Sequence, residues 1–395
     1  MQAIRLKQGR ERSVQRRHPW IYSGAVEEVI GYPGLGETVD VLDQAGTWLA
    51  RAAYSPNSNI RARIWTWNPE EAVDDQFFER KIKAAILSRI SLAEDTDTNA
   101  YREIHAESDG IPGVVLDRYN EQRVVQLLTA GAEAWRESII SVLAQLGDCD
   151  GIYERSNVDV RKMEGLPPKT GCLWGKEPDA EMIIQQHGMR FYVNVLQGQK
   201  TGFYLDQREN RRRVRSLVRG RAVLDCFSYT GGFTVAALAG GATHVEAIDS
   251  STEALMLAKK NVAINELALD QCEWIQGDVF TELRKLRDRD KRFDAVVLDP
   301  PRFAPTASQA QKAARGYKDI NLLAFKLLRP GGLLFTFSCS GGVGFPLFEK
   351  IVAGAALDAG VEVRIIGWFN QPSDHPVGIQ FPEGRYLKGL TCLVG

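Results

Sequence analysis

Residues 222–233 read AVLDCFSYTGGF, and this stretch decides the fold of the C-terminal half of the chain. An apolar run ends at Asp225 and Cys226, and Gly231 and Gly232 then precede the helix-like segment FTVAALA. Glycines at a strand-to-helix turn let the backbone approach a ligand closely. The stretch therefore predicts a ligand-binding loop between a buried strand and a helix.

Four more apolar runs follow, with helical segments between most of them. They are HVEAID (244–249), CEWIQGD (272–278), DAVVLD (294–299) and LLFTFSC (333–339). This alternation indicates a parallel sheet that is covered on both faces. We expect an α/β, doubly wound domain over residues 186–395, with ligands beyond the carboxyl ends of its strands. Each run finishes in Asp or Cys, so these polar groups are predicted to converge there.

The strand ends also indicate the cofactor. Asp249 lies 18 residues beyond Gly231 (249 − 231), close to where nucleotide-binding folds place a carboxylate for ribose hydroxyls. Ser250 and Glu253 are expected to form a capping box, and Asp278 could accept a hydrogen bond from an adenine amino group.

The GxGxxG pattern that admits a pyrophosphate is absent, which disfavours NAD. S-adenosylmethionine, a nucleoside without a diphosphate, fits better, although a simpler interpretation is that the carboxylates only cap helices. The cofactor-binding residues expected here are Asp225, Phe227, Tyr229, Gly231, Asp249, Ser250, Asp278 and Asp299.

The fourth run continues into DPPRF (299–303), where the chemistry is expected. Pro300 and Pro301 make a stiff loop that lacks backbone donors and presents Asp299 and Phe303 in a fixed relation. Asp-Pro-Pro-aromatic recurs in enzymes that methylate nucleobases, where the acid bonds the base edge and the ring stacks on its face. We therefore predict substrate contacts from Pro300, Pro301 and Phe303.

Cys339 ends the fifth run between Ser338 and Ser340, and a buried strand needs no thiol there. The simplest interpretation is a small apolar residue. However, the fifth strand lies beside the fourth in such a sheet, so Cys339 would face Asp299. Thiolate addition to carbon 6 of cytosine would make carbon 5 nucleophilic, with an acid at the ring nitrogen. Cys339 would need nearby donors or positive charge to ionise, and Ser338, Ser340 and the sulfonium are candidates. Cys226 is expected to serve packing.

The first 70 residues carry short strand-like runs separated by glycines, which indicates a small β-rich domain. Its basic residues include Arg5, Lys7, Arg10, Arg12, Arg16 and Arg17, and its aromatic residues include Trp20, Tyr22, Trp48, Trp65 and Trp67. Basic and aromatic side chains together suit RNA. The alternative is that the tryptophans form the core and the arginines a solvated face. Residues 71–185 are predicted to form an α+β middle domain.

Bulk composition excludes several classes of protein. The formal net charge of the 395-residue chain is −1, which argues against nucleic-acid binding by bulk charge alone. The six cysteines form no CxxC pair, so neither a structural zinc site nor a disulfide framework is expected. No apolar run reaches 18 residues, and we expect a cytoplasmic protein without membrane or metal. A homodimer is compatible with the sequence, which leaves the oligomeric state open.

Several long strings resemble one known family. They are QQHGMRFYVNVLQGQKTGFYLDQRENR, DCFSYTGGF, DPPRF, RGYKDIN, FSCSGG and the final DHPV…PEGRYLKG. These strings resemble bacterial RlmI-type methyltransferases, which use S-adenosylmethionine to make 5-methylcytosine in 23S ribosomal RNA. The stretch RRHPWIYSGAV is similar to the N-terminal PUA domain of that family, an RNA-binding module, and ESDGIPGVVLDRY to its middle domain. The resemblance covers nearly the whole chain.

The resemblance implies site residues and a partner. Cys339 would be the nucleophile, and Asp225, Asp249, Asp278 and Asp299 would line the cofactor and base pocket. Tyr204, Gln207 and Arg208 would close over the cofactor, with Arg208 pairing with its carboxylate. Alternatively, Arg208 is the first of a solvated arginine run. Arg302 stands where many RNA cytosine-5 methyltransferases carry a second cysteine, so the base that removes the carbon-5 proton stays unassigned.

The sequence is also compatible with two other functions. One is methylation of a base nitrogen by an enzyme of the same fold, which would need no thiol. The other is a non-catalytic RNA-binding or ribosome-assembly factor with a vestigial cofactor pocket. The complete set of acids together with Cys339 favours the cytosine-5 methyltransferase.

Overall fold

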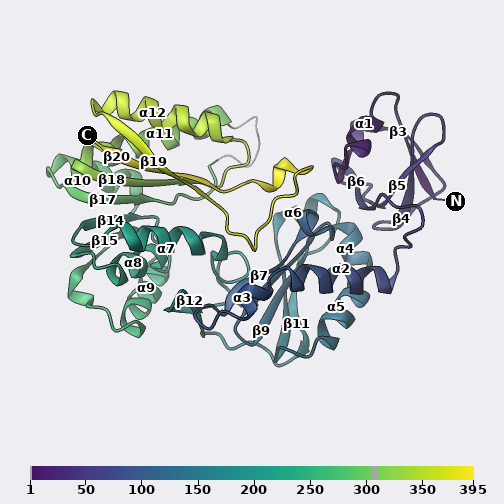
Figure 1. Cartoon of the computed structure of the whole chain (residues 1–395), viewed down its shortest axis with the longest axis horizontal. Helices are drawn as coiled ribbons and strands as arrows, with labels where there is room; N and C mark the ends of the chain where they lie inside the picture. The colour runs from purple at the N-terminus through teal and green to yellow at the C-terminus, as the bar shows by residue number, and fades with distance from the viewer. Residues whose placement is uncertain (1, 304–309) are drawn as a thin grey trace. The chain divides into compact units, whose positions relative to one another are not determined.

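The computed structural model describes residues 2–303 and 310–395 (Figure 1). The chain divides into two compact units. The first unit comprises Met1–Ile184, Val193–Leu205 and Ser373–Gly384, and the second comprises Gln185–Tyr192, Asp206–Pro372 and Arg385–Gly395. In the described ranges, no helix has both the length and the apolar character needed to cross a membrane.

The second unit is built on a seven-stranded sheet in the order β16-β15-β14-β17-β18-β20-β19. Its strands are β14 (Ala222–Cys226), β15 (His244–Asp249), β16 (Cys272–Gln276), β17 (Phe293–Leu298), β18 (Leu328–Ser338), β19 (Val363–Asn370) and β20 (Lys388–Val394). The five strands from β16 to β18 pair in parallel, and β20 is antiparallel to both of its neighbours. This arrangement confirms the doubly wound sheet and adds β19 and β20 to the five predicted strands.

Helices cover both faces of this sheet, as Figure 1 shows. One face carries α7 (Arg208–Leu217), α8 (Gly232–Ala239) and α9 (Thr252–Ile264), and the other carries α10 (Val279–Asp288), α11 (Ala310–Leu327) and α12 (Phe345–Ala359). Leu224 and Cys226 are fully buried in the core against α10, α11 and α12. Asp225, between them in a strand, must face the other side of the sheet, where α8 begins. The packing role expected for Cys226 is therefore confirmed.

Helix α9 begins one residue later than expected. The Ser251 hydroxyl accepts a hydrogen bond from the Ala254 amide at 3.1 Å, so Ser251 is the N-cap residue. The predicted capping box of Ser250 with Glu253 is wrong, since the Glu253 carboxylate accepts from the Ser251 hydroxyl at 3.0 Å. The cause is Asp249, whose Oδ1 accepts from the Ser251 amide at 2.9 Å and extends the turn after β15 by one residue.

The first unit contains two larger sheets. One has the order β2-β6-β5-β4-β1-β3, and the other has the order β11-β10-β9-β8-β7. The strands of the first sheet are β1 (Ala3–Leu6), β2 (Trp20–Tyr22), β3 (Val26–Ile30), β4 (Thr38–Leu42), β5 (Trp48–Tyr54) and β6 (Ile60–Thr66). Those of the second are β7 (Ala100–His105), β8 (Val114–Tyr119), β9 (Gln122–Leu127), β10 (Gly151–Ser156) and β11 (Lys169–Gly175). The β-rich N-terminal segment and the α+β middle segment are thus confirmed as structural classes, while domain boundaries at residues 70 and 185 stay predictions.

Short helices accompany these sheets. They are α1 (Glu11–Gln15), α2 (Asp75–Leu87), α3 (Ile90–Ala93), α4 (Ala130–Ala134), α5 (Arg136–Gln145) and α6 (Asp159–Met163). A separate two-stranded sheet consists of β12 (Met182–Gln186) and β13 (Met189–Val193). Phe77 and Phe78 on α2 pack edge-on against Trp65, which is 2% exposed. For Trp65, the interpretation as a core residue is therefore correct.

Candidate active site

The loop between β14 and α8 has an unusual backbone. Phe227 and Tyr229 adopt φ angles of 62° and 49°, which are rare for residues other than glycine. At Gly231 (φ 78°) an added Cβ would lie 2.8 Å from Cβ of Ala258, so only glycine fits. The Tyr229 amide donates to Oδ2 of Asp249 at 2.8 Å. The surrounding structure thus holds the loop in a strained form, which is common where a protein binds a ligand.

Three buried side-chain oxygens at this loop have no hydrogen-bond partner among the residues that the structure describes. They are Oδ1 of Asp225, Oγ of Ser228 and Oγ1 of Thr230. The other oxygen of Asp225 accepts from the Thr234 hydroxyl at 2.7 Å, and the residue is 1% exposed. A buried polar atom without a partner costs about 1–3 kcal/mol. A ligand with hydroxyl or amino donors, such as a nucleoside, would satisfy these atoms.

Burial raises the pKa of Asp225 to about 7, and the negative charges of Asp299 and Asp249 add to the effect. Between pH 3.8 and about 7, the folded protein therefore holds a proton at Asp225 that the unfolded chain has released. The free energy of unfolding of the ligand-free protein must fall as the pH rises through this window.

We expect Asp225→Asn to remove this part of the pH dependence, because asparagine stays neutral at every pH. The variant should gain free energy of unfolding relative to the wild type as the pH rises to 7, by at most about 4 kcal/mol. Urea denaturation between pH 4 and 8 measures the difference. Asp278→Asn, at an exposed position, is the control. If the free energy of unfolding of Asp225→Asn changes with pH as steeply as that of the wild type, the raised pKa of Asp225 is contradicted.

Two of the other strand-end acids, Asp249 and Asp278, have different local partners. Both carboxylate oxygens of Asp249 accept backbone amides, from Tyr229 and from Ser251, so its position at the end of β15 is fixed. Asp278 is exposed and caps α10, accepting from the Thr281 amide at 3.0 Å and from its hydroxyl at 2.9 Å. The capping interpretation is thus correct for Asp278. Its contact with a cofactor, like that of the exposed Ser250, stays a prediction.

Asp299 follows β17 and is oriented by a chain of amides. Nε2 of Gln207 donates to Oδ1 of Asp299 at 2.9 Å, and Nδ2 of Asn210 donates to Oε1 of Gln207 at 2.6 Å. Gln207 is 2% exposed and Asn210 is 3% exposed. Asp299 itself is half-buried, with Pro300 buried and Pro301 exposed after it. A half-buried acid held by buried amides is suited to contact a base.

The residues predicted from GFYLDQR fall in different places. Arg208 is buried at 1% exposure, with Nε 3.2 Å from Oε1 of Glu209, so the solvated-run interpretation is wrong for it. That interpretation is correct for Arg212, whose side chain is 61% exposed. Tyr204 belongs to the first unit, where its hydroxyl donates to Gln199 and Nζ of Lys200 lies 4.6 Å from its ring centre. Closure of these residues over the cofactor stays a prediction.

Cys339 directly follows β18, which pairs in parallel with β17. Leu298 near the end of β17 is paired with Thr336 near the end of β18. Asp299 and Cys339, which follow these two neighbouring strands, therefore lie beyond the same edge of the sheet. Cys339 is half-buried. The expected proximity of thiol and acid follows from this register.

Tyr317 on α11 lies beside both groups. Burial raises its pKa, and negative charge at Cys339 and Asp299 raises it further. Its hydroxyl is 2.9 Å from Oγ of Ser340, and its ring centre is 4.8 Å from that of Phe303. The site thus joins Asp299, Phe303 and Cys339 with a tyrosine that strand-end reasoning missed. The string RGYKDIN, which carries Tyr317, was its only sequence signal.

Comparison with known proteins decides the family. Residues 156–365 match the family of S-adenosylmethionine-dependent methyltransferases, and residues 4–67 match PUA-like domains. "Ribosomal RNA large subunit methyltransferase I" of Enterobacter sp. (strain 638) is 51% identical over 98% of each chain. The protein of that name from Klebsiella pneumoniae is 52% identical over 98% of this chain and 97% of its own. The chain belongs to the ribosomal RNA large subunit methyltransferase I family.

Two solved structures share the fold of this methyltransferase I family member over the whole length of both chains. A structure described as a methyltransferase from Streptococcus mutans is 21% identical, with a TM-score of 0.86. A methyltransferase in complex with SAH is 22% identical, with a TM-score of 0.88. The cofactor is S-adenosylmethionine, as expected. Its amino and hydroxyl donors fit the unpartnered oxygens of Asp225, Ser228 and Thr230.

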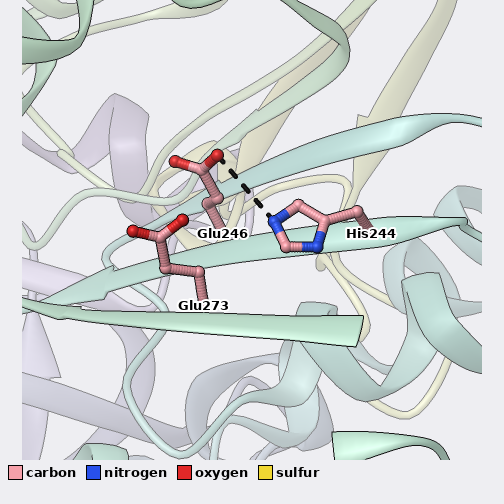
Figure 2. Close-up of side chains that lie close together, drawn as sticks. All are labelled: His244, Glu246 and Glu273. Atoms are coloured by element: carbon pink, nitrogen blue, oxygen red, sulfur yellow. Dashed lines mark ion pairs between the residues drawn. The ribbon is translucent and has the colours of Figure 1, made fainter. Parts of the chain in front are cut away.

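A second cluster of ionisable groups lies on β15 and β16 of this methyltransferase (Figure 2). His244, Glu246 and Glu273 point toward one another, with Nε2 of His244 3.8 Å from Oε1 of Glu246. Nζ of Lys291 lies 2.9 Å from the same oxygen. Lys291 therefore supplies the positive charge that the buried Glu246 requires, and His244 begins the strand that Asp249 ends. The ion pair with Lys291 accounts for the buried carboxylate of Glu246, and we assign the cluster no metal.

Proposed function

We propose that this enzyme methylates carbon 5 of a cytosine in 23S ribosomal RNA through a transient bond between Cys339 and carbon 6. The relatives are named for the RNA of the large ribosomal subunit. The observation that carries the finer proposal is the placement of Cys339 and Asp299 beyond neighbouring parallel strands. A nitrogen methyltransferase needs an acceptor such as Asp299 but no thiol at this place.

The proposed reaction has four steps, in which Cys339 and Asp299 act. The Cys339 thiolate bonds to carbon 6, and the π electrons of the 5,6 double bond move toward carbon 5 and the ring. Asp299 donates a hydrogen bond or a proton to ring nitrogen 3, which takes up the developing charge. S-adenosylmethionine, when bound, supplies the electrophilic methyl group that carbon 5 accepts. A base then removes the proton from carbon 5, the double bond re-forms, and the Cys339 thiolate leaves as nitrogen 3 returns its proton.

The product of the reaction tests this proposal directly. The protein is incubated with labelled S-adenosylmethionine and with ribosomal RNA from cells that lack the enzyme, and the RNA is digested to nucleosides. We expect the label in 5-methylcytidine from the large-subunit RNA. Label in a methylated adenosine or guanosine, or on the exocyclic nitrogen of cytidine, would overturn the proposal.

The PUA-like segment offers a place for the RNA. Its pocket of about 360 Å³ is lined by Arg10, Ser13, His18, Trp20, Tyr22, Gly24 and Ala25. Nε1 of Trp20 donates to Oε1 of Glu107 at 2.8 Å, which fixes the indole, and Tyr22 is 47% exposed beside it. A fixed aromatic wall, an exposed ring and an arginine suit an unstacked base with its phosphate. We propose that this pocket holds a single-stranded nucleotide of the substrate.

We expect Tyr22→Ala to weaken RNA binding roughly 5- to 100-fold, because one base loses its stacking partner. Arg10→Ala should lower affinity and reduce the slope of log K against log salt by about one. Filter binding at several salt concentrations measures both effects. Tyr32→Ala is the matched control, because Tyr32 is 99% exposed and lies outside the pocket lining. If Tyr22→Ala binds RNA as tightly as Tyr32→Ala does, the pocket is not the RNA site.

A further inference from the structure

Strand β20 places a lysine against the loop that carries Cys339. Lys388, the first residue of β20, is paired with Ser338 at the end of β18. Its side chain is buried, with the residue at 3% exposure. Nζ donates to the backbone carbonyl of Ser340 at 2.9 Å. The ammonium is therefore directed to the residue that follows the thiol, from a strand that the sequence analysis did not place.

The pKa of this buried lysine is lowered, but it stays above neutral pH. Burial lowers the pKa of Lys388 to about 8, and nearby Arg302 and Arg385 lower it as well, whereas negative charge at Cys339 opposes the shift. Asp299, after β17, is the acid on the neighbouring strand, and Tyr317 on α11 is neutral because its pKa is raised. At pH 7 the buried lysine thus carries a positive charge beside Cys339.

The side chains of the two serines that flank the thiol form hydrogen bonds to groups other than the thiol. Oγ of Ser338 accepts from the Ser340 amide at 3.3 Å, and Oγ of Ser340 pairs with the Tyr317 hydroxyl at 2.9 Å. These bonds hold the loop in place. The positive charge that Cys339 needs for ionisation is better supplied by an ammonium, since a buried charge acts strongly on a neighbouring thiolate.

We propose that Lys388 is a positioning residue that stabilises the Cys339 thiolate and fixes the loop that carries it. This inference rests on the proposed function, in which Cys339 attacks carbon 6. The ammonium favours the thiolate both before attack and when the sulfur leaves carbon 6. Its bond to the Ser340 carbonyl holds the backbone next to Cys339, so charge and position come from one side chain.

The test measures ionisation of the thiol without RNA or cofactor. The full-length wild type, Lys388→Met and Lys388→Arg are treated with iodoacetamide from pH 5 to 10, and the rate at the Cys339 peptide is followed by mass spectrometry. The pH at which the alkylation rate of Cys339 reaches half its maximum is the midpoint. We expect Lys388→Met to raise this midpoint by about one to two pH units and to slow alkylation at pH 7 roughly 10- to 100-fold. Lys388→Arg, which keeps the charge, should restore most of the rate. Methylation by Lys388→Met should recover toward pH 9.

A purely structural role for Lys388 gives a different result. Loss of loop geometry alone would lower methylation equally at every pH and leave the alkylation midpoint unchanged, which would overturn the proposal. A midpoint in Lys388→Arg shifted as far as in Lys388→Met would also overturn it. If Lys388→Met does not fold, Lys388→Gln provides the neutral variant. Failure of the proposed function would appear separately, as a product other than 5-methylcytidine while the midpoint still moves.

Discussion

Cys339→Ala is expected to abolish RNA methylation while the affinity for S-adenosylmethionine is unchanged. Without the thiolate, carbon 5 of cytosine is too weak a nucleophile to accept a methyl group, so we expect a loss of at least about 10⁴-fold in kcat. The unpartnered oxygens that fit the cofactor belong to Asp225, Ser228 and Thr230 and are unaffected by this change. Single-turnover methylation and calorimetric titration with the cofactor measure the two quantities.

A matched control and a covalent trap sharpen this result. Cys172→Ala removes an exposed thiol from β11 in the first unit and should leave methylation at the wild-type rate. RNA that contains 5-fluorocytidine has no proton to lose at carbon 5, so the adduct should persist and map to Cys339. Substantial methylation by Cys339→Ala would instead favour attack by a base nitrogen. A wild-type protein that transfers no methyl group to any RNA would favour the non-catalytic assembly factor.

The sheet was predictable because its central strands are buried on both faces. Val223, Leu224, Val296 and Val297 are fully buried, so their strands read as continuous apolar runs rather than alternating ones. The predicted bounds of β14 and β15 agree with the structure. The proximity of Asp299 and Cys339 could be inferred in the same way, from the order of neighbouring parallel strands.

Features that depend on distant pairing could not be predicted in this way. Lys388 lies 48 residues beyond Ser340, and only the antiparallel register of β20 with β18 brings it there. Arg208 opens an arginine-rich run that appears solvated in the sequence, yet helix α7 turns it inward to 1% exposure. Thr234, which donates to Asp225, lies on a helix face whose neighbours are all apolar or small, so no motif marks it. A long-range contact decides the role of Lys388, whereas the packing of helices α7 and α8 decides the roles of Arg208 and Thr234.

Replacement of Asp299 is expected to have the second largest effect, and it separates hydrogen bonding from proton transfer. Asp299→Asn keeps a group that can bond to the base edge but cannot exchange a proton with ring nitrogen 3. We expect kcat at saturating cofactor to fall roughly 10²-fold in Asp299→Asn and up to about 10⁴-fold in Asp299→Ala. Rapid-quench methylation assays measure the rates.

The amide chain behind Asp299 predicts a graded series. Gln207→Ala removes the donor to Oδ1 of Asp299 but leaves the carboxylate in place, so we expect a loss of only about tenfold. Asp288→Asn, at an exposed position in the last turn of α10, is the control and should match the wild type. If Asp299→Asn methylates RNA as fast as the wild type, proton exchange at this position is not required. Asp299 would then serve only as a hydrogen-bonding group, as it would in a nitrogen methyltransferase, and the rates of Asp299→Asn and Cys339→Ala together would assign the reaction class.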